Sequence, residues 1–433
     1  MEGIIGVCDS IEGAQDIYYG SMGDRDAWRY YFIQKRERSN EVDADILMNS
    51  KVWEASGHVS GFSDPLVDCK ECKTRHRADN LIDDFAPEAN ADAMTQEEMN
   101  AYIKEHKVIC PVCGKSNFTE IRQFNLMFGT KRGVTEESGA MIYLRPENAQ
   151  GEYVNFLNVQ RTMRAKLPFS IGQIGKAFRN EITPGNFTFR TIEFEQMEYQ
   201  TFCKKGTDSE TYEYFKEYGM EFFQYLGLPK EKLRFHDHEK LAHYAKEACD
   251  IEYAFPLGWG EINGTHNRTD FDLTRHQEFS KKSMDYLEEE TGEKFVPYVI
   301  ESTYGLDRII LALLFENLHE EMVGESDKRI VLNIAPKLAP IKVNVLPLIK
   351  KKHSEMAKQV YHQLMPYMMV NYDETGSIGK RYRRGDAIGI PFAVTIDDNT
   401  LENGTITIRD RDSMEQEVIP MEGVVPYLLT KLK

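Results

Sequence analysis

Two segments about a hundred residues apart most constrain this chain, because each combines an arginine, carboxylates and an aromatic ring. The first runs from Phe178 to Glu198 and holds the stretch Thr183-Pro184-Gly185-Asn186 between two strand-like runs. Proline and glycine there favour a turn, so residues 176–200 are predicted to form a long antiparallel hairpin. The second, Glu301-Ser302-Thr303-Tyr304-Gly305-Leu306-Asp307-Arg308, is predicted to be a strand that runs into a buried helix.

Alternation along the second half of the hairpin sorts its side chains onto two faces. One face is expected to carry a guanidinium, an aromatic ring, an amide and a carboxylate, from Arg190, Ile192, Phe194, Gln196 and Glu198. Such a face can clamp phosphate oxygens, stack on a purine and hold an ammonium group. The alternative is an exposed hairpin whose charges are simply solvated.

The second segment adds a glycine and a further arginine. Gly305 would let a ligand approach the backbone closely, and Arg308 could cover a phosphate or a stacked base. Asp307 and Arg308 could equally be a solvated helix start, where the helix dipole favours an aspartate. That alternative does not account for Glu301, because a lone carboxylate in an apolar strand is costly. Together the two segments predict a site for a nucleoside triphosphate and a small ammonium-bearing substrate.

Length and pattern predict more than one domain. A chain of 433 residues is long for a single hydrophobic core, and its 41% hydrophobic and 28% charged residues are ordinary for a globular protein. Pro336 and Pro340 interrupt the pattern, and strands alternate with helices beyond them, which predicts a small α/β domain over 333–433. We place a first domain at 1–332, with one insertion at 61–120 and a helical insertion at about 203–255.

The charge is acidic but uneven. A net charge of −17 argues against a general nucleic-acid coat protein, whereas residues 333–433 have a slight excess of basic residues. The run Lys380-Arg381-Tyr382-Arg383-Arg384 could bind nucleic-acid phosphates and stack on a base, or be a solvated basic turn. No stretch reaches the length of a membrane span and no basic, apolar leader is seen, so a cytoplasmic location is expected.

Four of the seven cysteines form two Cys-x-x-Cys pairs, Cys69 with Cys72 and Cys110 with Cys113. In a cytoplasmic chain such pairs predict a structural zinc site with four thiolate ligands rather than disulfides. The alternative is four reduced thiols without a metal. The isolated cysteines are expected to be inert: Cys8, Cys203 and Cys249.

The two segments resemble motifs 2 and 3 of the class II aminoacyl-tRNA synthetases. Further stretches occur in that family's order: Trp53-Glu54-Ala55-Ser56-Gly57-His58, Phe62-Ser63-Asp64-Pro65, Arg77-Ala78-Asp79, Leu144-Arg145-Pro146-Glu147-Asn148-Ala149-Gln150-Gly151 and Arg268-Thr269-Asp270-Phe271-Asp272-Leu273. From about residue 42 to the C-terminus the chain resembles glycyl-tRNA synthetases of the dimeric (α2) type. The resemblance implies an α+β fold, with a class II antiparallel sheet, flanking helices and a C-terminal α/β anticodon-binding domain.

The same resemblance implies a glycine–tRNA ligase. Such an enzyme activates glycine with ATP and Mg²⁺ to glycyl-adenylate, then transfers the glycyl group to the 3′ end of tRNA(Gly). Two other functions stay open at this point. One is a non-catalytic, synthetase-like accessory protein that binds nucleic acid, and the other is a class II synthetase for another small amino acid.

Residue by residue, the resemblance implies catalytic roles for Arg179, Glu261 and Arg308. Arg179 and Glu181 would lie at the α-phosphate and adenine, Arg190 at the γ-phosphate and Phe194 on the adenine ring, while Glu261 would hold ATP through magnesium. The implied ATP-binding set is Arg179, Asn180, Glu181, Phe189, Arg190, Thr191, Ile192, Glu193, Phe194, Glu261, Ile262, Gly305, Leu306, Asp307 and Arg308. The implied glycine-binding set is Arg77, Glu147, Phe194, Glu195, Gln196, Met197, Glu198, Glu301, Ser302, Thr303, Tyr304 and Gly305. His58 and His266 would be hydrogen-bonding walls of the site.

The resemblance also implies a homodimer, although one of the family's motifs cannot be recognised in this sequence. Motif 1, a proline-containing helix and strand at the dimer interface, is not recognisable in residues 1–41, and the first proline of the chain is Pro65. Two smaller departures are Asn148, where the family usually has threonine, and Ser302-Thr303-Tyr304, where it usually has Pro-Ser.

Overall fold

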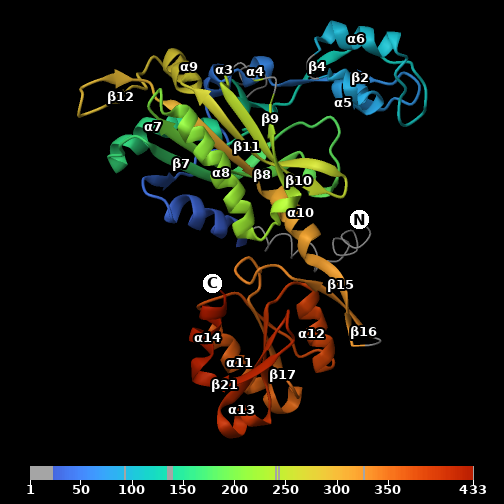
Figure 1. Cartoon of the computed structure of the whole chain (residues 1–433), viewed down its shortest axis with the longest axis vertical. Coiled ribbons are helices and arrows are strands. Elements are labelled where there is room, and N and C mark those ends of the chain that lie inside the picture. The colour runs from blue at the N-terminus through green and yellow to red at the C-terminus, as the bar shows by residue number, and fades with distance from the viewer. Residues whose placement is uncertain are drawn as a thin grey trace.

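The computed structural model describes residues 23–91, 94–133, 140–238, 241, 244–324 and 327–432. Figure 1 shows a larger body built around one sheet, and a smaller C-terminal body below it. The two are connected by β15 (Leu318–Val323) and β16 (Asp327–Leu332), which pair antiparallel. Cys8 lies outside the described residues. Within the part of the chain that is described, no helix combines the length and apolar character needed to cross a membrane.

The main sheet has seven strands in the order β1-β7-β8-β14-β11-β10-β9. Only the short β1 pairs parallel, and the other strands are antiparallel neighbours. This confirms the antiparallel sheet of the α+β prediction. The strand bounds are β1 (Ser39–Glu41), β7 (Phe169–Phe178), β8 (Glu193–Cys203), β9 (Leu233–Asp237), β10 (Glu247–Phe255), β11 (Gly258–Thr269) and β14 (Tyr298–Gly305).

The predicted hairpin exists as β7 and β8, which pair from Phe169–Phe202 to Phe178–Glu193. Its connection is longer than a tight turn, because it includes the 3₁₀ turn η4 (Phe187–Phe189) and left-handed backbone at Asn186 and Phe187. The face prediction therefore holds for the strand residues Phe194, Gln196 and Glu198. It is wrong for Arg190 and Ile192, which precede the strand.

Helices cover both faces of this sheet. On one face α8 (Asp208–Leu226) and α10 (Leu306–Asn317) share a core with a helical segment at 23–34, whose second half is the π-helix η1 (Arg29–Gln34). We call residues 23–34 the N-terminal helix; it buries Trp28, Tyr31 and Phe32 against α8 and the sheet. On the other face lie α7 (Ala149–Met163) and α9 (Phe271–Ser280).

The helical insertion predicted at about 203–255 is wrong in its second half. Its single long helix, α8, packs on the main sheet, while β9 and β10 are strands of that sheet. The helix itself agrees with the prediction, but the aromatic side chains of α8 contact the core of the main sheet and not a separate body. A small ribbon of β12 (Tyr286–Leu287) and β13 (Lys294–Phe295) and the 3₁₀ turn η5 (Lys230–Lys232) complete this region.

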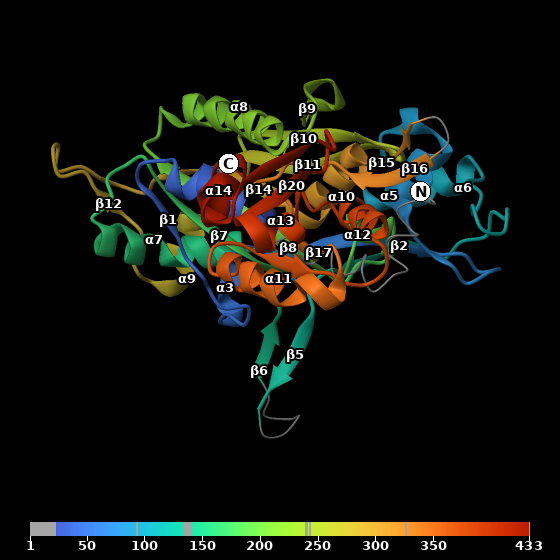
Figure 2. The ribbon, with the colours of Figure 1, turned by 90° about the horizontal axis from the view of Figure 1, so that it is seen from below.

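A separate lobe lies beside the main sheet and has its own hydrophobic core (Figure 1). It contains the three-stranded sheet β3-β2-β4 and two helices. Its elements are β2 (Ser63–Asp68), β3 (Arg75–Arg77), α5 (Ala78–Phe85), η2 (Pro87–Ala89), α6 (Gln96–Glu105) and β4 (Arg122–Asn125). Two short helices, α3 (Ser50–Ala55) and α4 (His58–Gly61), precede it, and a hairpin of β5 (Gly129–Arg132) and β6 (Ala140–Tyr143) projects from the body in Figure 2.

The C-terminal body is a five-stranded sheet in the order β18-β17-β19-β20-β21, packed against helices around one core. The alternation of strands and helices confirms the α/β prediction for this part. The elements are β17 (Val343–Pro347), α11 (Lys350–Leu364), β18 (Val370–Tyr372), α12 (Ile378–Ala387), β19 (Phe392–Ile396), α13 (Asp398–Asn403), β20 (Thr405–Asp410), β21 (Gln416–Pro420), η6 (Met421–Gly423) and α14 (Val424–Lys431). The polar α13 and the exposed edge strand β21 had given no apolar period by which to predict them.

Candidate active site

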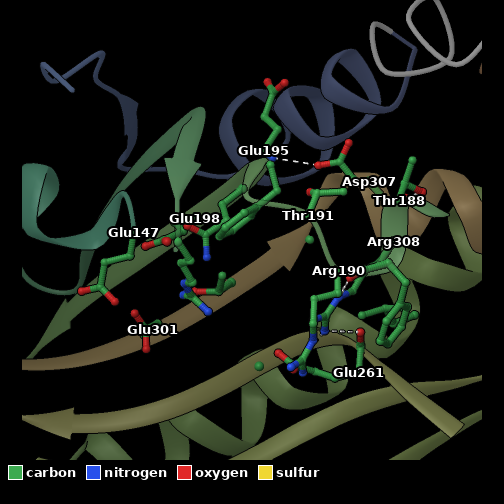
Figure 3. A pocket seen from close by; sticks show the side chains of 18 of the residues that line it. Glu147, Thr188, Arg190, Thr191, Glu195, Glu198, Glu261, Glu301, Asp307 and Arg308 are labelled. Atoms are coloured by element: carbon green, nitrogen blue, oxygen red, sulfur yellow. Dashed lines mark hydrogen bonds and ion pairs between the residues drawn. The ribbon is translucent and has the colours of Figure 1, made fainter. Parts of the chain in front are cut away.

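The two segments that each combine an arginine, carboxylates and an aromatic ring, 178–198 and 301–308, meet at one cavity of about 200 Å³. Strands β8, β14 and β11 supply its floor, the loop before β8 supplies one wall, and the first turn of α10 closes an end (Figure 3). The strand alternation of β8 and β14 turns Phe194, Gln196, Glu198, Glu301 and Thr303 toward this space. Basic groups gather at one end of the cavity and carboxylates at the other.

Arg308 is fixed at the basic end by the passage of β14 into α10. Its Nε donates to the carbonyl of Phe189 (3.0 Å), and its guanidinium lies 4.4 Å from the centre of the Phe189 ring. Its Nη1 donates to the carbonyl (2.9 Å) and the carboxylate (3.1 Å) of Glu261. The enclosed position of Glu261 opposes its ionisation, but the positive charges of Arg308 and Arg179 outweigh this effect. They hold the pKa of this carboxyl below its ordinary value.

Arg179 and Arg190 reach the same end from the loop between β7 and β8. Arg179 Nε donates to the carbonyl of Pro146 (3.1 Å), and its guanidinium lies over the rings of Phe62 (5.3 Å) and Phe194 (5.2 Å). Arg190 Nη1 stands 3.7 Å from Glu181 Oε2. Three guanidinium groups, two from this loop and one from α10, therefore converge beside an aromatic ring, as a triphosphate with a stacked base requires.

The acidic end contains three glutamates, of which two already face basic side chains. Glu301 Oε2 accepts from Arg268 Nη1 and from His266 Nδ1, both at 3.0 Å. Glu147 Oε2 stands 3.4 Å from His58 Nε2. Burial opposes ionisation of both carboxyls, yet Arg268 and the histidines hold the pKa of each below its ordinary value.

Glu198 differs from these two. It accepts from the backbone N–H of Asn148 (3.1 Å) and the side-chain amide of Gln200 (3.4 Å), and no ion pair of the described residues includes it. Burial, followed by the charges of Glu301 and Glu147, raises the pKa of Glu198 well above its ordinary value. The pocket therefore has one carboxyl that still needs a cation.

The N-terminal helix also touches the site. Arg25 forms an ion pair with Glu195, whose backbone N–H donates to Asp307 Oδ2 (2.8 Å). Asp307 in turn lies in the first turn of α10, beside Arg308 (Figure 3). The N-terminal helix thus braces the strand and the helix start between which the cavity lies.

Most of the residues expected from the sequence line the cavity, and the main exceptions follow from strand alternation. The side chains of Met197 and Tyr304 point to the opposite face and are buried in the core under α8, so their placement in the glycine pocket is corrected. Ser302 and Leu306 are likewise buried away from the cavity. The predicted residues that do line it are Glu147, Arg179, Glu181, Phe189, Arg190, Thr191, Phe194, Glu195, Gln196, Glu198, Glu261, Ile262, Glu301, Thr303, Gly305, Asp307 and Arg308.

Four more predicted residues stand outside the cavity lining. Ile192 is exposed, Glu193 pairs with Lys176 on the neighbouring strand, and Asn180 hydrogen-bonds through its backbone to Leu126. Arg77 pairs with Asp79 and with Asp64 (3.1 Å to its Nη1). It faces Glu181, at the nucleotide end, and not the three glutamates.

The cavity also includes side chains that were absent from the expected binding sets. Arg268 lies in the Arg-Thr-Asp-Phe-Asp-Leu stretch, and its even-numbered neighbours on β11, Gly264 and His266, line the cavity too, so alternation could have found them. His266 has the wall position that was expected. Thr188 and Tyr244 come from irregular segments, where no local pattern marks them.

The four paired cysteines converge in the insertion lobe. Their Sγ atoms all lie within 4.8 Å of one another, and the pairs Cys69–Cys113 and Cys72–Cys110 are each 3.6 Å apart. Cys203 and Cys249 are buried elsewhere, and burial raises the pKa of each thiol to about 12, which agrees with inert side chains.

The basic run in the C-terminal body is largely engaged in structure. Arg381 is 3% exposed and donates to the carbonyl of Pro347 (2.7 Å). Arg383 and Arg384 form ion pairs with Asp327 and Asp373. Three cations of the run are therefore already engaged within the protein, while Lys380 is exposed.

The geometry can now be compared with known proteins. Residues 128–317 match the family described as the tRNA synthetase class II core domain (G, H, P, S and T), and residues 342–431 match the anticodon binding domain. Residues 88–126 match glycyl-tRNA synthetase insertion domain 1. The antiparallel sheet, the cleft between its motif-like segments and the C-terminal body thus define a class II aminoacyl-tRNA synthetase.

Curated relatives narrow the class further. The chain is 54% identical to a glycine–tRNA ligase of Clostridium acetobutylicum, over 94% of this chain and 89% of that protein. It is 54% identical to one of Ruminiclostridium cellulolyticum, over 96% and 92%, and 49% identical to one of Clostridium beijerinckii, over 100% and 98%. The chain belongs to the glycine–tRNA ligase family.

Proposed function

We propose that this chain activates glycine with ATP and transfers the glycyl group to tRNA(Gly). The observation that carries the proposal is one cavity with three guanidinium groups at one end and three glutamates at the other. A triphosphate suits the first end and an ammonium group the second. A non-catalytic accessory protein would need neither, so the retained Arg179, Arg190, Glu261 and Arg308 favour the enzyme over that alternative.

The nucleotide would occupy the basic end. Phe194 offers a ring to the adenine, Arg190 and Arg179 offer guanidinium groups to the phosphates, and Arg308 covers the nucleotide from α10. Glu261 provides carboxylate oxygen, the ligand chemistry that Mg²⁺ prefers, on a side chain that is 50% exposed to the cleft. When bound there, magnesium would neutralise charge on the phosphates.

Glycine would occupy the acidic end. It has no side chain to grip, so a site can recognise only its ammonium and carboxylate and must exclude larger amino acids by shape. Glu198 and Glu301 face the ammonium position, with Glu147 beside them, and Gln196 and Thr303 complete the lining. Larger amino acids would clash with this wall, which is the easier direction of selectivity and requires no editing site.

The chemistry needs no protein nucleophile. The glycine carboxylate is already ionised and attacks the α-phosphorus in line, and pyrophosphate leaves. Arg179 stabilises the charge that develops on the α-phosphate, because its guanidinium is preorganised over Phe62 and Phe194. The terminal ribose of the tRNA then takes the glycyl group from the adenylate.

A zinc ion in the insertion lobe is part of the proposal. Four sulfurs at about 2.3 Å from a common zinc stand roughly 3.8 Å apart in a tetrahedron. The observed separations of 3.6 Å and the upper limit of 4.8 Å are compatible with that arrangement. Zinc would hold the β2–β3 turn against the segment that precedes β4, a structural role.

We further propose a homodimer of the α2 type, a cytoplasmic location, and a division into a catalytic part (1–332) and an anticodon-binding part (333–433). The N-terminal helix followed by β1 at the edge of the main sheet has the helix-then-strand order of motif 1, which supports the dimer. Sedimentation at micromolar concentration tests it, with a single 50 kDa species as the contradicting result.

Charging of tRNA tests the function. With ATP and Mg²⁺, the chain is expected to attach labelled glycine to a tRNA(Gly) transcript and to leave a tRNA(Ala) transcript uncharged. Binding of tRNA(Gly) without charging, by protein whose folding is confirmed by circular dichroism, would favour the accessory-protein alternative instead.

A further inference from the structure

A fourth glutamate, which is buried, lies behind the proposed glycine pocket. Glu152 is in the first turn of α7 and is 0% exposed. Neither of its carboxyl oxygens has a hydrogen-bond partner in the described structure. An ionised carboxylate in such a place is very costly, so its burial calls for a chemical explanation.

The cations around the pocket are already committed to other carboxylates. Arg268 forms two hydrogen bonds with Asp272, at 2.7 and 3.0 Å, and one with Glu301 at 3.0 Å. His266 also bonds Glu301, and His58 faces Glu147. Among the described residues, Glu198 and Glu152 are the two carboxyls of this cluster for which no ion pair is found.

The nearest remaining cation, Arg145, forms no ion pair with either carboxyl, although its charge acts on both. Arg145 is in the loop before α7, and its guanidinium donates to the carbonyls of Lys176 (2.6 Å) and Ala44 (2.7 Å). Tyr153 donates its hydroxyl proton to Gln200 (2.9 Å), and Tyr244 lines the cavity. The charged groups that act on Glu198 or Glu152 are Arg145, Glu147, Arg268 and Glu301.

We infer that glycine binds in exchange for a proton: its ammonium replaces the proton that Glu198 holds in the empty pocket, while Glu152 stays a neutral acid behind it. This inference rests on the proposed function, because it takes the acidic end to be the ammonium site. The exchange balances, since the O–H bond of Glu198 breaks, the proton leaves to solvent and the ammonium keeps its three hydrogens. The ammonium takes over the positive charge of the lost proton at Glu198, and the complex as a whole is one proton poorer than the empty chain plus glycine.

The electrostatics agree with this geometry. Burial is the main cause that raises the pKa of both Glu198 and Glu152 well above the ordinary value, and the charges of Glu301 and Glu147 add to it. For Glu152 the charge of Glu198 adds further, and the backbone N–H of Gln200 offsets only part of the rise. Closely spaced carboxyls without a cation cannot all ionise. An ammonium group in the pocket reverses the balance for the carboxyl it touches, and Glu198 is the one that lines the cavity. Glu152 is outside the lining and, as a neutral acid, adds no second charge behind the pocket.

Calorimetric titration of glycine at pH 7, in two buffers of different ionisation enthalpy, measures the protons released. The inference expects about one proton per glycine. It also expects the KM for glycine in ATP–pyrophosphate exchange to fall about tenfold for each unit that the pH rises, as long as the pH is below the pKa of Glu198. The kcat for exchange should change little over the same range. No proton release, with glycine-dependent exchange intact, would overturn the inference and leave the proposed function standing. Loss of both glycine binding and exchange would instead contradict the proposed function.

The variant Glu152→Gln separates the two carboxyls, because glutamine copies the shape of a neutral acid. It is expected to keep the wild-type KM for glycine and the release of about one proton. If the proton release disappears in E152Q, the proton belongs to Glu152 and the assignment to Glu198 is overturned. If E152Q does not fold, the two-buffer measurement on the wild-type chain still decides the exchange.

Discussion

Arg308 donates to both the backbone carbonyl and the carboxylate of Glu261, at 2.9 and 3.1 Å, and so joins the first turn of α10 to β11 across the nucleotide end of the cavity. The same guanidinium also bonds the Phe189 carbonyl (3.0 Å) in the loop before β8. One side chain therefore holds three elements in the arrangement that ATP is proposed to meet.

Replacement of this arginine should damage activation more than folding. Arg308→Ala is expected to lower kcat/KM for ATP by about 10²- to 10³-fold, because a preorganised charged donor to the nucleotide is lost. Pyrophosphate exchange at varied ATP measures the effect. Arg161→Lys, on an exposed part of α7, is the matched control and should behave as wild type. An R308A variant with unchanged ATP dependence would refute the role of Arg308.

The contact of Arg25 with Glu195 predicts that the N-terminal helix influences the site. The two side chains are 28% and 12% exposed, so a pair of this kind contributes about 1 kcal/mol. Arg25→Met is expected to raise the KM for ATP about fivefold with a smaller change in kcat. Arg29→Met, on the same helix, removes a pair with Glu41 of β1 and is the control. Equal effects of the two variants would show general destabilisation instead of bracing.

Zinc content provides an independent test of the insertion lobe. Metal analysis of the purified chain is expected to give about one zinc per protein, and Cys110→Ser is expected to lose most of it. Cys249→Ser removes a buried thiol outside the cluster and should keep the metal. If C110S and the wild-type chain both contain no zinc after purification without chelators, the four-thiolate site is refuted.

The buried carboxyl of Glu152 should affect how the free energy of unfolding depends on pH. Its folded pKa is raised by burial and by Glu198 and Glu301, so the folded chain keeps a proton that the unfolded chain loses above about pH 4.3. This contribution to stability therefore falls as pH rises, by at most about 1.4 kcal/mol per unit. Urea unfolding of wild type and E152Q should show little difference at pH 5 and a relative gain for E152Q at pH 7.5. The same difference at both pH values would contradict a protonated Glu152.

Variants in the basic run at 380–384 should distinguish a residue that contacts nucleic acid from one that supports the fold. Lys380→Gln is expected to weaken tRNA binding modestly and to reduce the salt slope of the affinity by about one, with no change in thermal stability. Arg381→Gln should instead lower the melting temperature, because Arg381 is buried and bonds Pro347. Filter binding at several salt concentrations and thermal unfolding distinguish the two. A reversed pattern would refute the structural assignment.

Local periodicity explains what the sequence could predict. Alternation placed Phe194 and Glu198 on the cavity face, and a turn-rich stretch between apolar runs predicted the β7–β8 pairing. Alternation does not apply to Arg190, because this residue lies in the connecting loop and not in the strand. The loop is fourteen residues long, from 179 to 192, and no local signal in the sequence predicts that length. The resemblance of whole motifs implied that Met197 and Tyr304 bind glycine, although strand alternation turns both side chains into the core.

The remaining features depend on long-range packing. Strands β9 and β10 belong to the main sheet because β10 pairs with β11, which in turn pairs with β14, and the pattern of residues 203–255 alone does not show that pairing. The Arg25–Glu195 contact joins residues 170 positions apart. Glu152 directly follows the Leu144–Gly151 stretch in the sequence, but only the fold shows that this carboxyl is fully buried behind Glu198.

Glycine-dependent exchange of pyrophosphate into ATP tests the central claim most directly, that one cavity holds ATP beside a pocket shaped for glycine. The chain is expected to catalyse exchange with glycine, while alanine and serine support it at least about a hundredfold less well, because a larger side chain clashes with the pocket wall. Folded protein that shows no exchange with glycine, or exchanges equally well with alanine, would contradict the account.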